Sequence, residues 1–210
     1  MHIRSKSFHD MQPIPAEFAF GQPGPQGEPC VFAANRNPHL TWSDVPEGTR
    51  SFVLTCIDVD APSVGDDVNQ VGRSVRAALP RTEFVHWLMI DISPEYREFG
   101  VGACAEGVVA HGKQEVSGPP GSRQGINDYT GWFAADESMR GDYYGYDGPC
   151  PPWNDERLHH YHFRVAALDV ASLGLEGRFD ISAVRKAMQG HVLAEAELIG
   201  TYTLSASLRR

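Results

Sequence analysis

The stretch SFVLTCID, residues 51–58, gives the clearest indication of the fold in this chain of 210 residues. It is rich in β-branched and aromatic residues and ends at an aspartate, a pattern typical of a buried β-strand. Three further segments share this pattern, and two short ones show it weakly: residues 85–92 (VHWLMIDI), 160–168 (HYHFRVAAL), 197–204 (ELIGTYTL), 2–8 and 40–42. The sequence therefore predicts four main strands and two minor ones.

One amphipathic helix is predicted between the last two main strands. Ile181, Val184 and Met188 recur at helical spacing, Asp180 can cap the start and Gly190 can end the helix. Strands outnumber helices and do not alternate with them, which disfavours a parallel sheet. The expected fold is mainly β: an antiparallel β-sandwich with one or two peripheral helices.

Length and composition place the chain among single-domain globular proteins. Eighteen Lys and Arg residues against 27 Asp and Glu residues give a net charge of −9, which disfavours a general nucleic-acid binder. No apolar run is long enough to cross a bilayer and no secretory signal is readable, so we expect a soluble, cytoplasmic protein without an integral membrane segment.

The chain has four cysteines: Cys30, Cys56, Cys104 and Cys150. They form no C-x-x-C pair, which predicts free thiols and no metal cluster.

Residues 100–154 are rich in glycine and proline and show no hydrophobic period. Such long irregular stretches are usually functional or insertional. The run GVGACA at residues 100–105 matches a loose dinucleotide-binding pattern, but later glycines interrupt the helix that a phosphate would need, so we interpret it as a chance match. The signatures of phosphoryl transfer, zinc proteases and serine hydrolases are not found in the sequence.

Two aspartates follow the first main strand. If extended geometry persists, Asp58 and Asp60 lie two residues apart on one face, and both carboxylates point into one cleft. The alternative is a strand-ending turn in which both carboxylates accept loop N–H groups.

Histidines form the second and third candidate groups. Strand periodicity places His86 on one face with Leu88, Ile90 and Ile92, where a histidine is more often a core residue than a ligand. After the run GPCPP at residues 148–152, His159 and Tyr161 share one face of a strand, whereas His160 and His162 share the other. A metal site of two histidines and one carboxylate is a further alternative, which the rigid proline-rich surroundings disfavour.

Taken in order, these segments resemble the phosphatidylethanolamine-binding protein family, which includes the Raf kinase inhibitor protein and a large bacterial branch. Four stretches carry the resemblance: DVDAPS at 58–63, HWL at 86–88, GPCPP at 148–152 followed by HHY at 159–161, and GHVLAEAEL at 190–198. The chain departs from the family pattern at Val59, which replaces a proline. Apparent insertions at residues 64–84 and 130–143 are further departures within one domain that spans residues 1–210.

The resemblance implies a Greek-key sandwich with a small cavity at one end that takes phosphate-like anions. Carried over residue by residue, the ligand-binding positions are Asp58, Asp60, Pro62, His86, Gly148, Pro149, Pro151, His159 and Tyr161. We expect His86 and His159, with Tyr161 beside them, to hold the anion, and the aspartates to fix histidine tautomers and loop geometry. No cofactor and no metal are implied.

Three functions are open at this stage. The first is a binding protein for a small phosphorylated ligand or phospholipid headgroup. The second is a regulator that docks a phosphorylated protein side chain, and the third is a hydrolase that uses the Asp/His cleft. Because no nucleophile with an adjacent base is identifiable, catalysis is not expected. The bacterial relatives suggest a homodimer, and we expect Cys150, between two prolines of the cavity wall, to be more accessible than Cys56.

Overall fold

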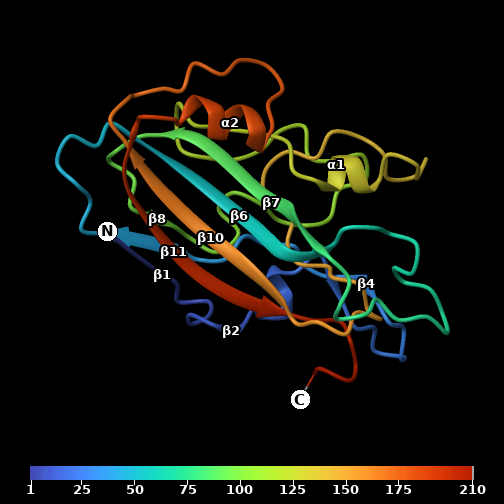
Figure 1. Cartoon of the computed structure of the whole chain (residues 1–210). Coiled ribbons are helices and arrows are strands. Elements are labelled where there is room, and N and C mark those ends of the chain that lie inside the picture. Colours follow the sequence, from blue (N-terminus) through green and yellow to red (C-terminus); the bar gives the residue numbers. More distant parts are fainter. Residues whose placement is uncertain (210) are drawn as a thin grey trace.

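The computed structural model describes residues 1–209 and is built around one large twisted sheet (Figure 1). The strand order is β2-β11-β10-β6-β7-β9, and all neighbours are antiparallel except β2 and β11. The long strands are β6 (Ser51–Pro62), β7 (Arg81–Ile92), β10 (His159–Leu168) and β11 (Val192–Tyr202), and the short ones are β2 (Gln12–Pro13) and β9 (Arg123–Gln124). The long connection after β7 returns the chain to the far side of β6, as in a Greek key.

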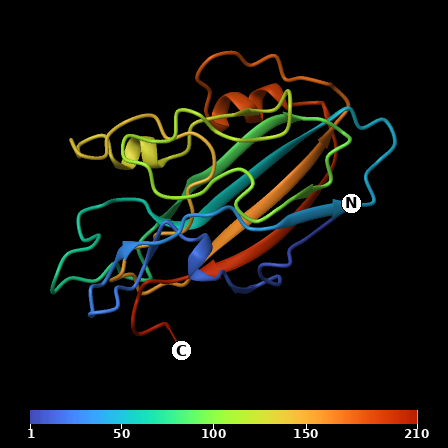
Figure 2. The same cartoon turned by 180° about the vertical axis from the view of Figure 1, so that it is seen from behind.

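Smaller elements surround this sheet. A three-stranded sheet, in the order β1-β5-β8, lies across one face of the long strands, and Figure 2 shows it from that side. Its strands and the remaining elements are β1 (His2–Arg4), β5 (Leu40–Ser43), β8 (Glu98–Phe99), the hairpin of β3 (Gly21–Gln22) and β4 (Val31–Phe32), the 3-10 helix η1 (Ala16–Phe18), and the helices α1 (Tyr129–Trp132) and α2 (Ile181–Ala187).

Two cores lie on the two faces of the large sheet. Between the sheets, Trp42 and Phe99 pack with Phe52, Trp87 and Phe163 in the larger core. Burial of such aromatic side chains stabilises a fold by about 1.5–3 kcal/mol each.

The second core lies beneath helix α2. Val184 of the helix and the neighbouring Phe179 pack against Leu88 and Ile90 of β7. Asp180 caps the helix as expected, since its side chain accepts a hydrogen bond from the Ala183 N–H at 2.9 Å. The mainly β sandwich with peripheral helices is therefore confirmed.

Two of the long strands begin several residues before their predicted starts. Strand β11 begins at Val192, because this segment pairs with β10 along its whole length despite an Ala- and Glu-rich start of low β-propensity. Strand β7 begins at Arg81, so residues 81–84, which the sequence placed in an insertion, extend the sheet.

The expected alternation of side chains along β7 is wrong at His86. The ladder with β6 pairs Cys56 with Trp87 and Ile57 with Val85, which leaves His86 as the extra residue of a bulge. His86 consequently does not share a face with Leu88 and Ile90, which pack beneath α2. Its ring instead lies 5.1 Å from that of Tyr161, between ring centroids.

The loop of residues 64–80 is fastened to the chain just before β10. Asn154 accepts a hydrogen bond from the Asn69 N–H at 3.0 Å and donates one to the carbonyl of Asp67 at 2.8 Å. Val75 forms a β-bridge with Asp155. The loop is thereby held beside the end of the sheet at which β6 ends and β10 begins. In the described residues no helix is long and apolar enough to cross a membrane.

Candidate functional site

A cavity of about 300 Å³ opens at the end of the large sheet where β6 ends and β7 and β10 begin. Six of the nine predicted site residues line it: Asp58, Pro62, His86, Pro151, His159 and Tyr161. Six further lining residues are aromatic: Phe20, Phe32, Phe84, Tyr129, Trp132 and Phe133. Segments distant in sequence thus form a cavity with a few polar groups in an apolar wall, which is typical of small-molecule sites.

Asp60 lies outside the cavity, contrary to the expectation that it shares a cleft with Asp58. The ladder between β6 and β7 is irregular between Asp58 and Ala61, so extended geometry is not maintained there. The Asp60 carboxylate instead accepts hydrogen bonds from the backbone N–H of His160 at 3.1 Å and from its Nδ1 at 2.8 Å. The two aspartates therefore engage neighbouring histidines on opposite faces of β10.

Gly148 and Pro149 also lie outside the cavity lining, where they position the wall through their backbone. The Pro149 carbonyl accepts hydrogen bonds from the N–H groups of Phe20 at 2.9 Å and Gly21 at 3.2 Å. The Gly148 carbonyl accepts one from the Tyr129 hydroxyl at 2.8 Å. A β-carbon on Gly148 would clash with the Phe18 carbonyl, so only glycine allows this close approach.

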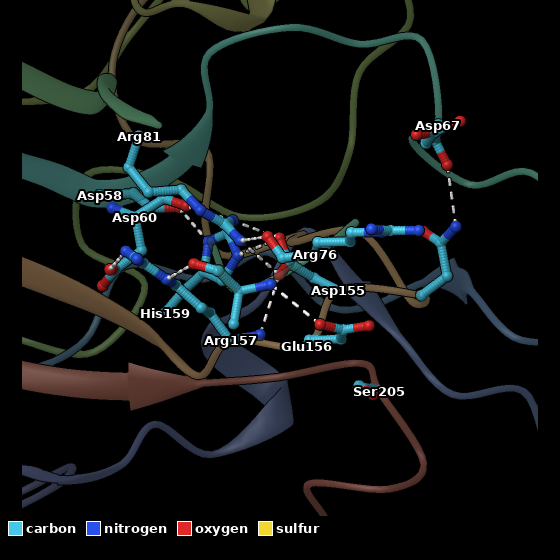
Figure 3. A network of polar contacts seen from close by, with 12 residues as sticks. Asp58, Asp60, Asp67, Arg76, Arg81, Asp155, Glu156, Arg157, His159 and Ser205 are labelled. Atoms are coloured by element: carbon cyan, nitrogen blue, oxygen red, sulfur yellow. Dashed lines mark hydrogen bonds and ion pairs between the residues drawn. The ribbon is translucent and has the colours of Figure 1, made fainter. Parts of the chain in front are cut away.

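Behind the cavity, His159 lies in a buried network of ion pairs, shown in Figure 3. Its Nδ1 is 2.7 Å from Asp58 Oδ2 and its Nε2 is 3.1 Å from Asp155 Oδ2. Arg81 binds Asp155 through both terminal nitrogens, at 2.5 and 2.9 Å. Carboxylates that face both ring nitrogens require both to be donors, so His159 is the doubly protonated cation.

The pKa values of the network agree with this assignment. Burial disfavours the charged imidazole, but the hydrogen bonds and charges of Asp155 and Asp58 outweigh it and raise the pKa of His159 to about 9. Burial likewise disfavours the charged carboxylate of Asp155, yet His159 and Arg81 lower its pKa to about 2. Two cations thus balance two carboxylates, and the network has no net charge.

This arrangement changes the role expected for His159. Both of its ring nitrogens are engaged by carboxylates, so it has no free N–H for a ligand anion. His159 and Tyr161 do share the inner face of β10, as predicted, and His162 lies on the opposite face beside Glu197. His159 therefore contributes to the wall and to its charge balance.

His86 is fixed in one tautomer. Its Nδ1 lies 2.8 Å from the Asp147 carbonyl oxygen, which can only accept, so Nδ1 is the protonated nitrogen. Burial lowers the pKa of His86 against the opposing effect of nearby carboxylates. The ring is neutral near pH 7, and Nε2, which has no hydrogen-bond partner in residues 1–209, is a free acceptor at the cavity.

Tyr161 supplies the complementary donor. Its side chain is fully buried and lines the cavity, and its hydroxyl has no hydrogen-bond partner in the part of the chain that the structure describes. Burial raises the pKa of this hydroxyl well above its usual value, so it stays protonated. The cavity therefore presents one free O–H donor beside one free ring-nitrogen acceptor.

Three polar residues that support the site escaped the sequence prediction. Arg81 and Asp155 lie in polar segments that resemble solvated loops. Asp147 is buried among Asn35, Lys113 and Asn127, whose side chains all donate to it, and its carbonyl holds His86. The position of Asp155 four residues before His159 is a weak signal in the sequence, and for Asp147 we find none.

The accessibility predicted for the cysteines is confirmed. Cys56 is fully buried in the core between the sheets, whereas Cys150 is partly exposed and lines the cavity.

Comparison with known proteins agrees with the fold. The model of the phosphatidylethanolamine-binding protein family matches residues 4–203. The chain belongs to this family. It is 33% identical over 202 residues to a UPF0098 protein of Aquifex aeolicus, which covers 96% of this chain and 88% of the relative. A UPF0098 protein of Methanothermobacter thermautotrophicus is also 33% identical, over 96% of this chain and 98% of the relative.

Two solved structures of phosphatidylethanolamine-binding protein relatives resemble this chain. Escherichia coli YbcL, described as a new member of the mammalian PEBP family, superposes with a TM-score of 0.69 at 26% identity, over 96% of this chain and 97% of YbcL. A homologue from Chlamydia trachomatis, CT736, gives a TM-score of 0.63 at 28% identity, over 96% and 95% of the two chains. The family resemblance read from the sequence is thereby confirmed.

Proposed function

We propose that the cavity binds a small ligand whose head carries both an anionic oxygen and an O–H or N–H donor. A phosphomonoester monoanion has this combination, and so has phosphoethanolamine, the headgroup of a phospholipid. The observation that carries the proposal is the unpartnered Tyr161 hydroxyl beside the free Nε2 of His86. The hydroxyl donates a hydrogen bond to the anionic oxygen, and Nε2 accepts a hydrogen bond from the O–H or N–H group of the ligand.

The charge of the surroundings permits such a head. The chain has a net charge of −9, but the buried network of Asp58, Asp155, His159 and Arg81 is neutral. A ligand monoanion therefore meets no net negative charge from this network. In a phosphomonoester without an amine, the P–OH group is the donor to Nε2. Affinity for such a ligand is therefore expected to weaken as its second ionisation, near pH ~6, is passed, whereas the ammonium group of phosphoethanolamine remains a donor.

The rest of the wall favours a ligand with an apolar body. Phe32 and Trp132 line the cavity and remain 61% and 51% exposed, so they lie at its rim. Phe20 and Phe84 continue the apolar surface toward His86. This supports a phospholipid-like ligand rather than inorganic phosphate, because apolar groups gain about 25 cal/mol for each Å² removed from water.

Binding is supported better than catalysis. Ser63 and Cys150 line the cavity, but within residues 1–209 neither side chain is hydrogen-bonded to a histidine that could act as its base.

The Tyr161→Phe variant separates ligand binding from folding. Affinity for phosphoethanolamine is expected to fall about 10- to 100-fold, because one hydrogen bond to a charged group is lost. The stability of the free protein is expected to stay within about 1 kcal/mol or to rise, since the lost hydroxyl has no protein partner. Calorimetric titration and urea denaturation measure the two effects.

A short-chain lysophosphatidylethanolamine, titrated below its micelle concentration, serves as the second ligand and is expected to bind more tightly than phosphoethanolamine. His162→Ala, on the outer face of β10, is the matched control and should leave both affinities unchanged. Equal affinities of wild type and Tyr161→Phe would contradict the proposed site.

A further inference from the structure

Two cysteines that are 120 positions apart in sequence meet beside the cavity. The Sγ atoms of Cys30 and Cys150 lie 3.7 Å apart, and both thiols are free. Both side chains are partly exposed, whereas Cys56 and Cys104 are buried. A hydroperoxide in solvent can thus reach this pair and not the other two thiols.

The fold holds this pair together from both sides. Cys30 precedes strand β4, which pairs with β3, and the N–H groups of Phe20 and Gly21 bind the carbonyl of Pro149, next to Cys150. A β-carbon on Gly21 would lie 2.5 Å from Cys150 Sγ and 2.6 Å from Cys30 Sγ. Glycine at position 21 therefore leaves the space that the two sulfur atoms share.

We propose that Cys30 and Cys150 form a dithiol site that a hydroperoxide oxidises to a disulfide. The Cys30 thiolate, which has lost its proton to solvent, attacks one peroxide oxygen, the O–O bond breaks, and Cys30 becomes a sulfenic acid. The hydroxide or alkoxide that leaves takes up a proton from solvent to give water or an alcohol. The Cys150 sulfur then attacks the Cys30 sulfur, an S–S bond forms, and hydroxide leaves and takes up the Cys150 proton to give water. Two thiols are oxidised and one peroxide is reduced.

The surroundings assign different roles to the two thiols. The hydrogen bond from the Cys150 thiol lowers the pKa of Cys30 against the opposing effect of burial. The same pairing, together with burial, raises the pKa of Cys150. Because the thiolate is the nucleophile, Cys30 attacks the peroxide and Cys150 resolves the sulfenic acid.

The disulfide would tie two parts of the cavity wall together. A disulfide bond is about 2.05 Å long, so the sulfur atoms must approach by about 1.7 Å from the 3.7 Å of the dithiol. The bond would join the β3–β4 hairpin, which carries Phe32, to the segment with Pro151 and Pro152. The oxidation of this cysteine pair does not depend on which ligand the cavity binds.

The experiment treats the native, fully reduced protein with a small excess of hydrogen peroxide and then labels the remaining thiols under denaturing conditions. The expected result is the loss of two hydrogen atoms from the intact monomer, two labelled thiols, and a cross-linked peptide that joins Cys30 to Cys150. The melting temperature should rise by several degrees, because the cross-link closes a long loop. Reduction with dithiothreitol should return it to the value of the untreated protein.

Two serine variants test the assigned roles. Cys150→Ser should accumulate a sulfenic acid on Cys30 that dimedone traps, whereas Cys30→Ser should react much more slowly under the same conditions. Four labelled thiols in the treated wild type, a cross-link that involves Cys56 or Cys104, or a disulfide between two chains would overturn the proposal.

Discussion

Replacing His159 by alanine is expected to lower the free energy of unfolding by about 3–5 kcal/mol, the cost of leaving a buried charge without its partner. The imidazolium is the only described contact that joins Asp58 to Asp155, and all three side chains are nearly fully buried. Arg81 still compensates Asp155 in the variant, so the main penalty falls on the Asp58 carboxylate. Urea denaturation at pH 7 measures this loss.

His162→Ala is the matched control for this substitution. His162 is on the same strand, and its Nδ1 lies 3.0 Å from Glu197, but both side chains are partly exposed. A pair of this kind contributes about 0–1 kcal/mol. Equal losses for the two variants would show that the network around His159 does not stabilise the fold.

Stability is also expected to fall by up to about 3 kcal/mol between pH 6.5 and pH 9. The pKa of His159 is raised from 6.5 to about 9 in the folded protein, so the folded state binds the proton more tightly than the unfolded state. The stabilisation is complete below pH 6.5 and is lost as the pH rises through 9, at 1.36 kcal/mol for each pKa unit.

Asp155 has the opposite dependence. Its pKa is lowered from 3.8 to about 2, so its stabilisation is present above pH 3.8 and is lost as the pH falls through 2.

Urea denaturation of wild type and His159→Ala at pH 6.5 and 9 isolates the loss of stability that comes from His159 at alkaline pH. The difference between the two proteins should shrink as the pH rises, and a constant difference would contradict the raised pKa of His159.

The long strands were predictable because their β-branched and aromatic residues are buried in the large sheet. The shared face of His159 and Tyr161 followed from simple alternation, since β10 is regular over these residues. Alternation failed for Asp60 and His86, because irregularities in the β6–β7 ladder rotate single residues to another face. Such irregularities depend on the pairing of two strands, which neither strand's sequence reveals.

The buried network of ion pairs around His159 could not be predicted from the sequence, for a different reason. Arg81 and Asp155 resemble surface charges, but the pairing of β7 with β6 and the attachment of the loop of residues 64–80 to Asn154 bring them together in a buried position. The proximity of Cys30 and Cys150 likewise depends on a contact between distant segments. Both features arise from tertiary contacts that local pattern does not encode.

The roles of the two histidines change accordingly. The sequence predicted that His86 and His159 both donate to an anion, whereas the geometry leaves His159 saturated by carboxylates and His86 with a free acceptor. The proposed ligand must therefore donate a hydrogen bond to His86, and it receives one from the Tyr161 hydroxyl.

Nitrogen-15 NMR of the histidine side chains at pH 7, with phosphoethanolamine titrated into the 210-residue chain, tests this assignment most directly. The account predicts that His86 Nε2 shifts on binding, as an acceptor that gains a donor, while both nitrogens of His159 remain protonated with and without ligand. A ligand-induced change at His159 with no change at His86, or a neutral His159 in the free protein, would contradict it.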